Sequence, residues 1–256
     1  MSKIFRNIHA CPHCGTHYLY YTGSFFTAEP FSHLTNGGSR YFMPLTTSFF
    51  DCNRCGNIFW IKDAKRVGCL DDEHSQMPYP GNRSIMPSSL KEVSIEKMID
   101  ALDTTMWFSS EEYLKPLKKS IWWYLTHPYS DHQVKFDKKS FLATLLDEYL
   151  SEYPLLPLES PSNYLSFSYQ PSDNHNSPYT GQIFIAELYR NLGLHAECML
   201  HIQRIKEVQP LVYSSYKLWI DRIEQVNNSG LTLAAPILGN AGYSILNQLL
   251  NEIILT

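Results

Sequence analysis

The sequence contains none of the short motifs that identify the common enzyme classes. It has no His-Glu-x-x-His pair for a hydrolytic zinc, no glycine-rich phosphate loop and no Gly-x-Ser-x-Gly turn for a nucleophilic serine. Asp71–His74 places carboxylates and an imidazole together, but no second cluster accompanies it to complete an acid–base site. We therefore predict that the protein is not an enzyme.

Strong charge and uninterrupted apolar runs are also missing. Charged residues make up 18% of the chain and the net charge is −4, whereas nucleic-acid binding usually shows as clustered Lys and Arg. The uncharged stretch from Leu231 to Leu250 includes Pro236 and several amides, which are costly in lipid, so we expect it to pack within the protein. The first residues lack the apolar core of a signal peptide, which favours a cytoplasmic location.

Cysteine is scarce, but its placement is informative. Four of the six cysteines form two Cys-x-x-Cys knuckles, Cys11/Cys14 and Cys52/Cys55, each followed by glycine. Two knuckles brought face to face supply the four thiolates of a tetrahedral zinc site, and the glycine tolerates the tight turn behind each. We predict structural zinc at these four cysteines, although iron accepts the same ligands. The two other cysteines are expected to be buried apolar residues.

Short runs of aromatic and β-branched residues surround the knuckles and predict strands. They are Tyr18–Tyr21, Arg40–Met43, Ser48–Phe50 and Ile58–Ile61. Residues 1–69 thus resemble the zinc-ribbon group, in which a β-hairpin follows each knuckle, and this implies a small antiparallel β domain. The stretch between the knuckles exceeds the usual gap of about 15–20 residues, so we expect an elaborated hairpin around Phe25–Gly38.

The rest of the chain has helical character. Residues 70–88 contain three prolines and a glycine, which predicts a linker. Within residues 89–256, Ser94 can cap one helix, Ser109–Glu112 has a capping-box pattern ahead of a second, and a third is expected over 136–150. A loop rich in proline, serine and asparagine is expected over 154–178.

From Gln182 onward, small, aromatic and apolar residues recur at helical intervals. Ala186, Tyr189, Gly193, Cys198 and Pro210 have the spacing of one tetratricopeptide repeat, and this segment resembles that family over one repeat length. The resemblance implies a helical hairpin that turns at the glycine and ends at the proline, with a further helix over 213–226. Because one hairpin cannot bury its apolar face alone, the other helices must complete the stack.

Two alternatives involve nucleic acid. The segment Arg190-Asn-Leu-Gly-Leu-His195 resembles the Arg-Asn-x-x-x-His motif of HEPN-type helical ribonucleases, which implies that Arg190 and His195 act on a phosphate. In the repeat interpretation, both are surface residues around a turn. The aromatic residues of 1–69, interleaved with Arg40 and Arg54, could stack on bases, or they could form the core that a small β domain needs.

The sequence therefore predicts an α+β multidomain protein: an antiparallel zinc ribbon followed by an all-α, tetratricopeptide-like domain. We expect a non-catalytic adaptor that binds another protein or peptide through its helices. Adjacent tryptophans can place one ring in the core and the other against a helix or partner. The candidate binding residues are Trp122, Trp123, Tyr189, Arg190 and His195.

Overall fold

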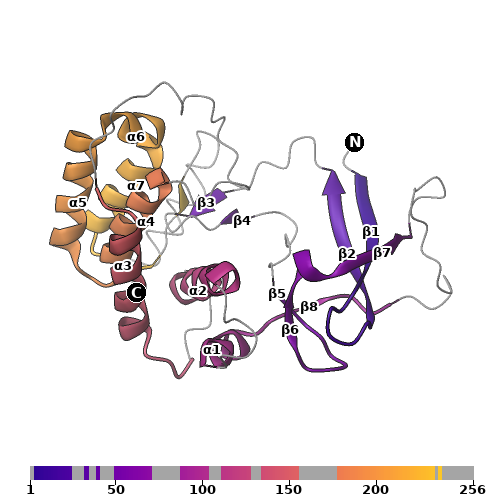
Figure 1. Ribbon diagram of the computed structural model, residues 1–256. Coiled ribbons are helices and arrows are strands. Elements are labelled where there is room, and N and C mark those ends of the chain that lie inside the picture. The colour runs from indigo at the N-terminus through magenta and orange to yellow at the C-terminus, as the bar shows by residue number, and fades with distance from the viewer. Residues whose placement is uncertain are drawn as a thin grey trace. The chain divides into compact units, whose positions relative to one another are not determined.

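The computed structural model contains two compact units. It describes residues 3–24, 32–34, 39–40, 49–70, 87–103, 111–127, 134–155, 178–233 and 236–237. The first unit comprises Met1–Glu29 with Tyr41–Leu117, and the second comprises Pro30–Arg40 with Lys118–Thr256. The described parts have small antiparallel sheets and a helical C-terminal region, so the architecture is α+β (Figure 1).

The first unit is built from two three-stranded antiparallel sheets, with strand orders β2-β1-β7 and β6-β5-β8. Their elements are β1 Lys3–Ala10, β2 His17–Ser24, β5 Phe49–Asp51, β6 Ile58–Trp60, β7 Lys65–Cys69 and β8 Lys91–Glu92, with a short 3-10 helix at Ile61–Asp63 and helix α1 at Ile95–Asp103. β1 pairs along its whole length with β2, from Lys3 opposite Ser24 to Ala10 opposite His17.

Aromatic rings form much of the core of this unit. The buried cluster consists of Cys11, Tyr18, Phe50, Cys52, Phe59 and Ala64. The ring of Tyr20 meets Phe50 edge-on at 5.8 Å between centroids, and Phe50 lies 6.2 Å from Phe59. Strands this short bury little surface each, so large rings supply most of the apolar contact.

The unit boundaries differ from those expected from sequence. Helix α1, expected in the helical domain, belongs to the first unit, whereas β3 at Ser32–Leu34 and β4 at Ser39–Arg40 belong to the second. Of the expected linker, residues 71–86 lie outside the described part of the chain, as do 156–177 of the expected loop.

The second unit contains helices and one small sheet of order β4-β3-β9. The remaining elements are α2 Glu111–Thr126, α3 Lys138–Glu152, α4 Pro178–Asn191, α5 His195–Val208, α6 Pro210–Ser215, α7 Lys217–Asn228 and β9 Pro236–Ile237, and the unit boundary falls within α2. α3 begins after Asp137, whose carboxylate accepts a hydrogen bond from the Ser140 N–H at 3.0 Å.

α4 and α5 form a helical hairpin with its turn at Gly193, where φ is +75°. The N–H of Leu194 donates to the carbonyl of Tyr189 at 2.9 Å and closes the end of α4. Cys198 is fully buried and Ala186 is 1% exposed, as expected for the positions of closest helix approach. The helix expected over 213–226 is instead two helices, α6 and α7, separated at Tyr216.

α3 and α4 approach closely at Gly181. A Cβ built on Gly181 would lie 2.7 Å from Cδ1 and Cδ2 of Tyr153 and still closer to Cγ. The Gln182 side chain also donates to the Tyr153 carbonyl at 2.6 Å. Glycine inside a helix costs about 1 kcal/mol relative to alanine, so packing against this ring accounts for its presence here.

Gly181→Ala should therefore destabilise the protein by about 1–3 kcal/mol, because the added methyl collides with the Tyr153 ring. The measurement is the unfolding midpoint in denaturant. In a Tyr153→Ala background the same substitution should be neutral or stabilising, since only the helix-propensity gain remains. A single Gly181→Ala variant more stable than wild type would contradict the packing explanation.

Candidate metal centre

Each knuckle begins where a strand ends. Cys11 follows β1 and Cys52 follows β5. The carbonyl of Cys11 accepts the Gly15 N–H at 2.9 Å, and that of Cys52 accepts the Gly56 N–H at 2.7 Å. Both glycines have positive φ, +70° and +73°, which side-chain-bearing residues rarely adopt. The glycine of each Cys-x-x-Cys-Gly sequence is thus required by the turn.

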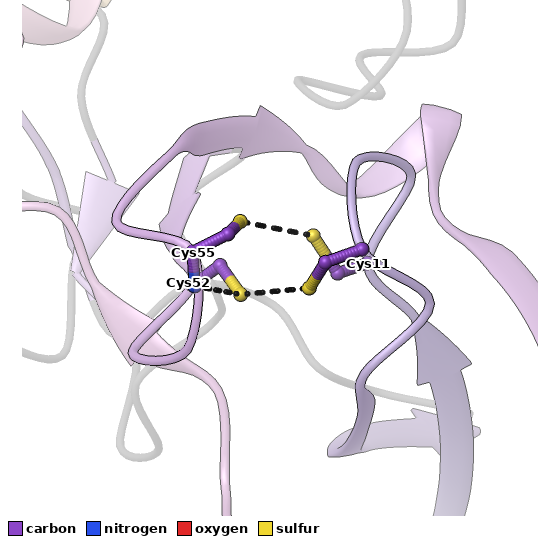
Figure 2. Close-up of side chains that lie close together, drawn as sticks. Cys11, Cys52 and Cys55 are labelled. Atoms are coloured by element: carbon purple, nitrogen blue, oxygen red, sulfur yellow. Dashed lines mark hydrogen bonds between the residues drawn. The ribbon is translucent and has the colours of Figure 1, made fainter.

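The four knuckle cysteines converge on one point. Their sulfur atoms all lie within 4.8 Å of one another. Across the two knuckles, Sγ of Cys11 lies 3.9 Å from that of Cys55, and Sγ of Cys14 lies 3.5 Å from that of Cys52 (Figure 2). Four sulfurs at about 2.3 Å from one tetrahedral ion would be about 3.8 Å apart. The cluster therefore fits a metal ion, and all six cysteines are free thiols.

The four thiols differ in how readily they ionise. Burial opposes ionisation of Cys52, but hydrogen bonds from the Tyr18 hydroxyl and from backbone N–H groups outweigh it and lower its pKa to about 6. Burial raises the pKa of the Cys11 thiol to about 12. At Cys14, which is exposed, the Thr16 hydroxyl lowers the pKa. A metal must displace the remaining protons, so binding will be coupled to proton release.

The neighbouring histidines have other contacts. His9 Nδ1 lies 3.1 Å from the carbonyl oxygen of Ala64, and His13 Nε2 lies 3.3 Å from that of Ile58. His17 is exposed at the start of β2. Among the described residues, the cluster of potential ligands consists of the four cysteines alone. An ion held by all four would have a complete tetrahedral set of ligands.

Tyr18 is a contact of the cluster that the sequence did not indicate. Its side chain is buried at 1% exposure, and its hydroxyl lies 3.1 Å from Sγ of Cys52. The same hydroxyl lies 2.6 Å from Oδ1 of Asn53, so its single proton is donated either to that oxygen or to the sulfur. In sequence Tyr18 is one of many aromatics near the knuckles, and only the folding of β2 beside the second knuckle brings it to the sulfur.

The two tryptophans of α2 differ in burial, as expected. Trp122 is fully buried, and its Nε1–H donates to Oδ1 of Asn191 at 2.8 Å. Trp123 and Tyr189 are half-buried and pack against the same helical core. The leftover cysteines, Cys69 and Cys198, are buried, as predicted for small apolar residues.

Arg190 and His195 bond to different partners. Arg190 is fully buried, so the expectation that it lies on the surface is wrong. Its Nε donates to Oε2 of Glu187 at 2.9 Å, and its Nη2 to the other oxygen of that carboxylate at 2.5 Å. His195 is half-buried, with Nδ1 2.7 Å from Oδ1 of Asn227. The Arg190 contacts to Glu187 lie within α4, whereas the His195 contact joins the start of α5 to α7.

The described aromatic rings of the first unit mostly pack against other residues of that unit. Trp60 stacks on Phe49 at 5.8 Å between centroids and 24° between planes. The ammonium of Lys62 lies 3.6 Å from the Trp60 ring centroid and forms an ion pair with Glu112. Asp71–His74 lies outside the described residues.

Comparison of the chain with protein-family models, curated proteins and solved structures found no match. In the described part of the chain, no helix is both long and apolar enough to cross a bilayer. A functional proposal therefore rests on the described residues themselves: the cysteine cluster for the metal, and the exposed side chains of the second unit for binding.

Cys52→Ala should strongly reduce metal binding and destabilise the first unit, because only Cys55 would remain to hold the ion from the second knuckle. Elemental analysis of the purified protein for zinc and iron measures the first effect, and thermal unfolding the second. Cys69→Ala is the matched control, since Cys69 is buried at 1% exposure but is not part of the cluster. Equal metal content in the two variants would refute the site.

Tyr18→Phe should weaken metal binding by about 10–100-fold, the usual effect of removing a hydrogen bond to a ligand. Competition with a chelator measures this affinity, and cobalt substitution adds a spectrum that reports on the sulfur ligands. Tyr20→Phe is the control because its ring packs against the same core. If both variants bound metal as wild type does, the Tyr18 hydroxyl would have no role at the site.

Proposed function

We propose that this protein is a non-catalytic, zinc-binding adaptor whose helical unit binds another protein or peptide. Zinc is the proposed metal because four cysteine sulfurs at tetrahedral spacing suit it and leave no position for substrate. Its role is structural: it joins the two knuckles and contributes folding energy to the first unit. In this proposal the first unit is a zinc ribbon.

The distribution of exposed apolar side chains supports the binding role. In the described residues, every large apolar side chain classed as exposed belongs to the second unit. They are Leu150 at 38%, Leu194 at 38%, Leu200 at 55%, Leu211 at 42% and Leu218 at 72%. Single exposed leucines are ordinary, but their restriction to one unit is the observation that carries the proposal.

The α4–α5 hairpin supports a tetratricopeptide-like helical domain. Its glycine turn at Gly193, and the buried small residues Ala186 and Cys198, lie where one repeat of that family would have them. Stacked helical hairpins present extended surfaces to peptides. Free cysteines suit a reducing compartment, so we place the protein in the cytoplasm.

A ribonuclease role receives less support from the contacts. Both carboxylate oxygens of Glu187 bond to Arg190, and this pair is fully buried. A guanidinium neutralised in this way has little attraction left for a phosphate. Buried rings such as Phe50 and Phe59 likewise cannot stack on bases without unfolding.

The test is affinity capture from native lysate with the full-length protein, half of the lysate being treated with nuclease. Wild type should retain the same partner protein in both halves. Leu218→Glu or Leu200→Glu should reduce its recovery at least tenfold, because a charge then replaces an exposed apolar contact.

Gln225→Glu and Gln203→Glu are the matched controls, since they add the same charge at exposed positions of α7 and α5. These variants should retain the partner. Capture of nucleic acid alone, or a partner lost after nuclease treatment, would overturn the adaptor proposal. A partner held equally by all variants would show that these leucines are not the contact.

A further inference from the structure

The C-terminal end of α4 holds a neighbouring segment of chain by its backbone. Nη1 of Arg190 donates to the carbonyl of Leu231, and Nη2 donates to the carbonyl of Leu233 at 2.8 Å. Between them, Nδ2 of Asn191 donates to the carbonyl of Thr232 at 2.7 Å. Two adjacent side chains therefore bind three successive carbonyls, and we call this pair the carbonyl clamp.

A strand pairing lies a few residues further along the chain. Residues 236–237 form β9, which pairs antiparallel with β3, Ile237 opposite His33 and Pro236 opposite Leu34. In the sheet order β4-β3-β9, β9 occupies the side of β3 that β4 leaves open. Addition of a strand to a sheet edge is one of the ways in which proteins bind extended peptides.

The charge of the clamp selects the kind of segment that it can hold. Glu187 and Arg190 are both fully buried and form an ion pair. The carboxylate neutralises the guanidinium and fixes its plane, so that the other N–H groups face the carbonyls. A neutral backbone satisfies these donors, whereas a phosphate or a terminal carboxylate would bring an unpaired negative charge into a buried site.

We propose that the carbonyl clamp and the β3 edge are a binding site for an extended, uncharged segment of a partner protein, which residues 231–233 and 236–237 of this chain occupy until the partner displaces them. This inference rests on the proposed function, because it assigns the partner's contact to a particular place. Recognition through carbonyls leaves the partner's side chains largely free to vary, and it tolerates proline, as Pro236 in β9 shows.

The experiment uses a full-length variant in which residues 231–237 are replaced by a Gly/Ser segment of equal length. The probe is a fluorescent peptide with the sequence of residues 229–239, and binding is measured by fluorescence anisotropy. The variant should bind the peptide at least tenfold more tightly than wild type, whose site is already occupied.

Two changes test whether the clamp itself is responsible. Asn191→Asp in the variant keeps the acceptor for Trp122 but removes the donor to Thr232, so peptide binding should fall at least tenfold. A peptide with a reduced amide bond between Thr232 and Leu233 lacks the carbonyl that Asn191 holds, and should bind as poorly. Binding unaffected by both changes would overturn the proposal.

The remaining outcomes are also decisive. A folded variant, judged by circular dichroism, that does not bind the peptide overturns the proposal. A variant that does not fold also overturns it, because a segment that cannot leave without unfolding the protein cannot be displaced. Either result leaves the adaptor function standing through the exposed leucines. Peptide binding without any captured partner would instead retain the site and reject the adaptor role.

Discussion

The convergence of four sulfur atoms is the constraint on which the first unit depends. β5 and β6 have only three residues each, and such strands bury too little surface to hold two sheets together. The knuckles sit at the ends of β1 and β5, one strand from each sheet, so one ion bound by both would join the sheets at that point. The aromatic core and the Tyr18 hydroxyl then close around that junction.

The second unit depends on a different polar constraint. The buried pair of Glu187 and Arg190 would be costly to form in isolation, and it is stabilised here by further hydrogen bonds to backbone carbonyls. Asn191 accepts a hydrogen bond from the indole of Trp122 in the core and donates one to the carbonyl of Thr232. The end of α4 therefore contacts both the helical core and the segment after α7. A role in peptide binding would use hydrogen-bond donors that the fold already orients.

Much of the local structure could be predicted because it depends on short-range chemistry. The Cys-x-x-Cys-Gly spacing predicted both turns, since only the geometry of a few adjacent residues is involved. Caps at Ser94 and the glycine turn at Gly193 were likewise predictable from neighbouring residues. The prediction for the segment after the repeat was less accurate: a single helix was expected over 213–226, but the chain forms α6 and α7.

By itself, the sequence determined the four-cysteine cluster through the spacing of the two knuckles, and strand-like and helical patterns indicated the α+β class. The helical hairpin was implied by the resemblance to one tetratricopeptide repeat. Only the tertiary structure decided the partners of the candidate site residues. Arg190 and His195 are close in sequence, yet one is buried against Glu187 and the other bonds to Asn227. Tyr18 reaches Cys52 across 34 residues of sequence separation. Such contacts depend on which strands and helices become neighbours, which no local pattern encodes.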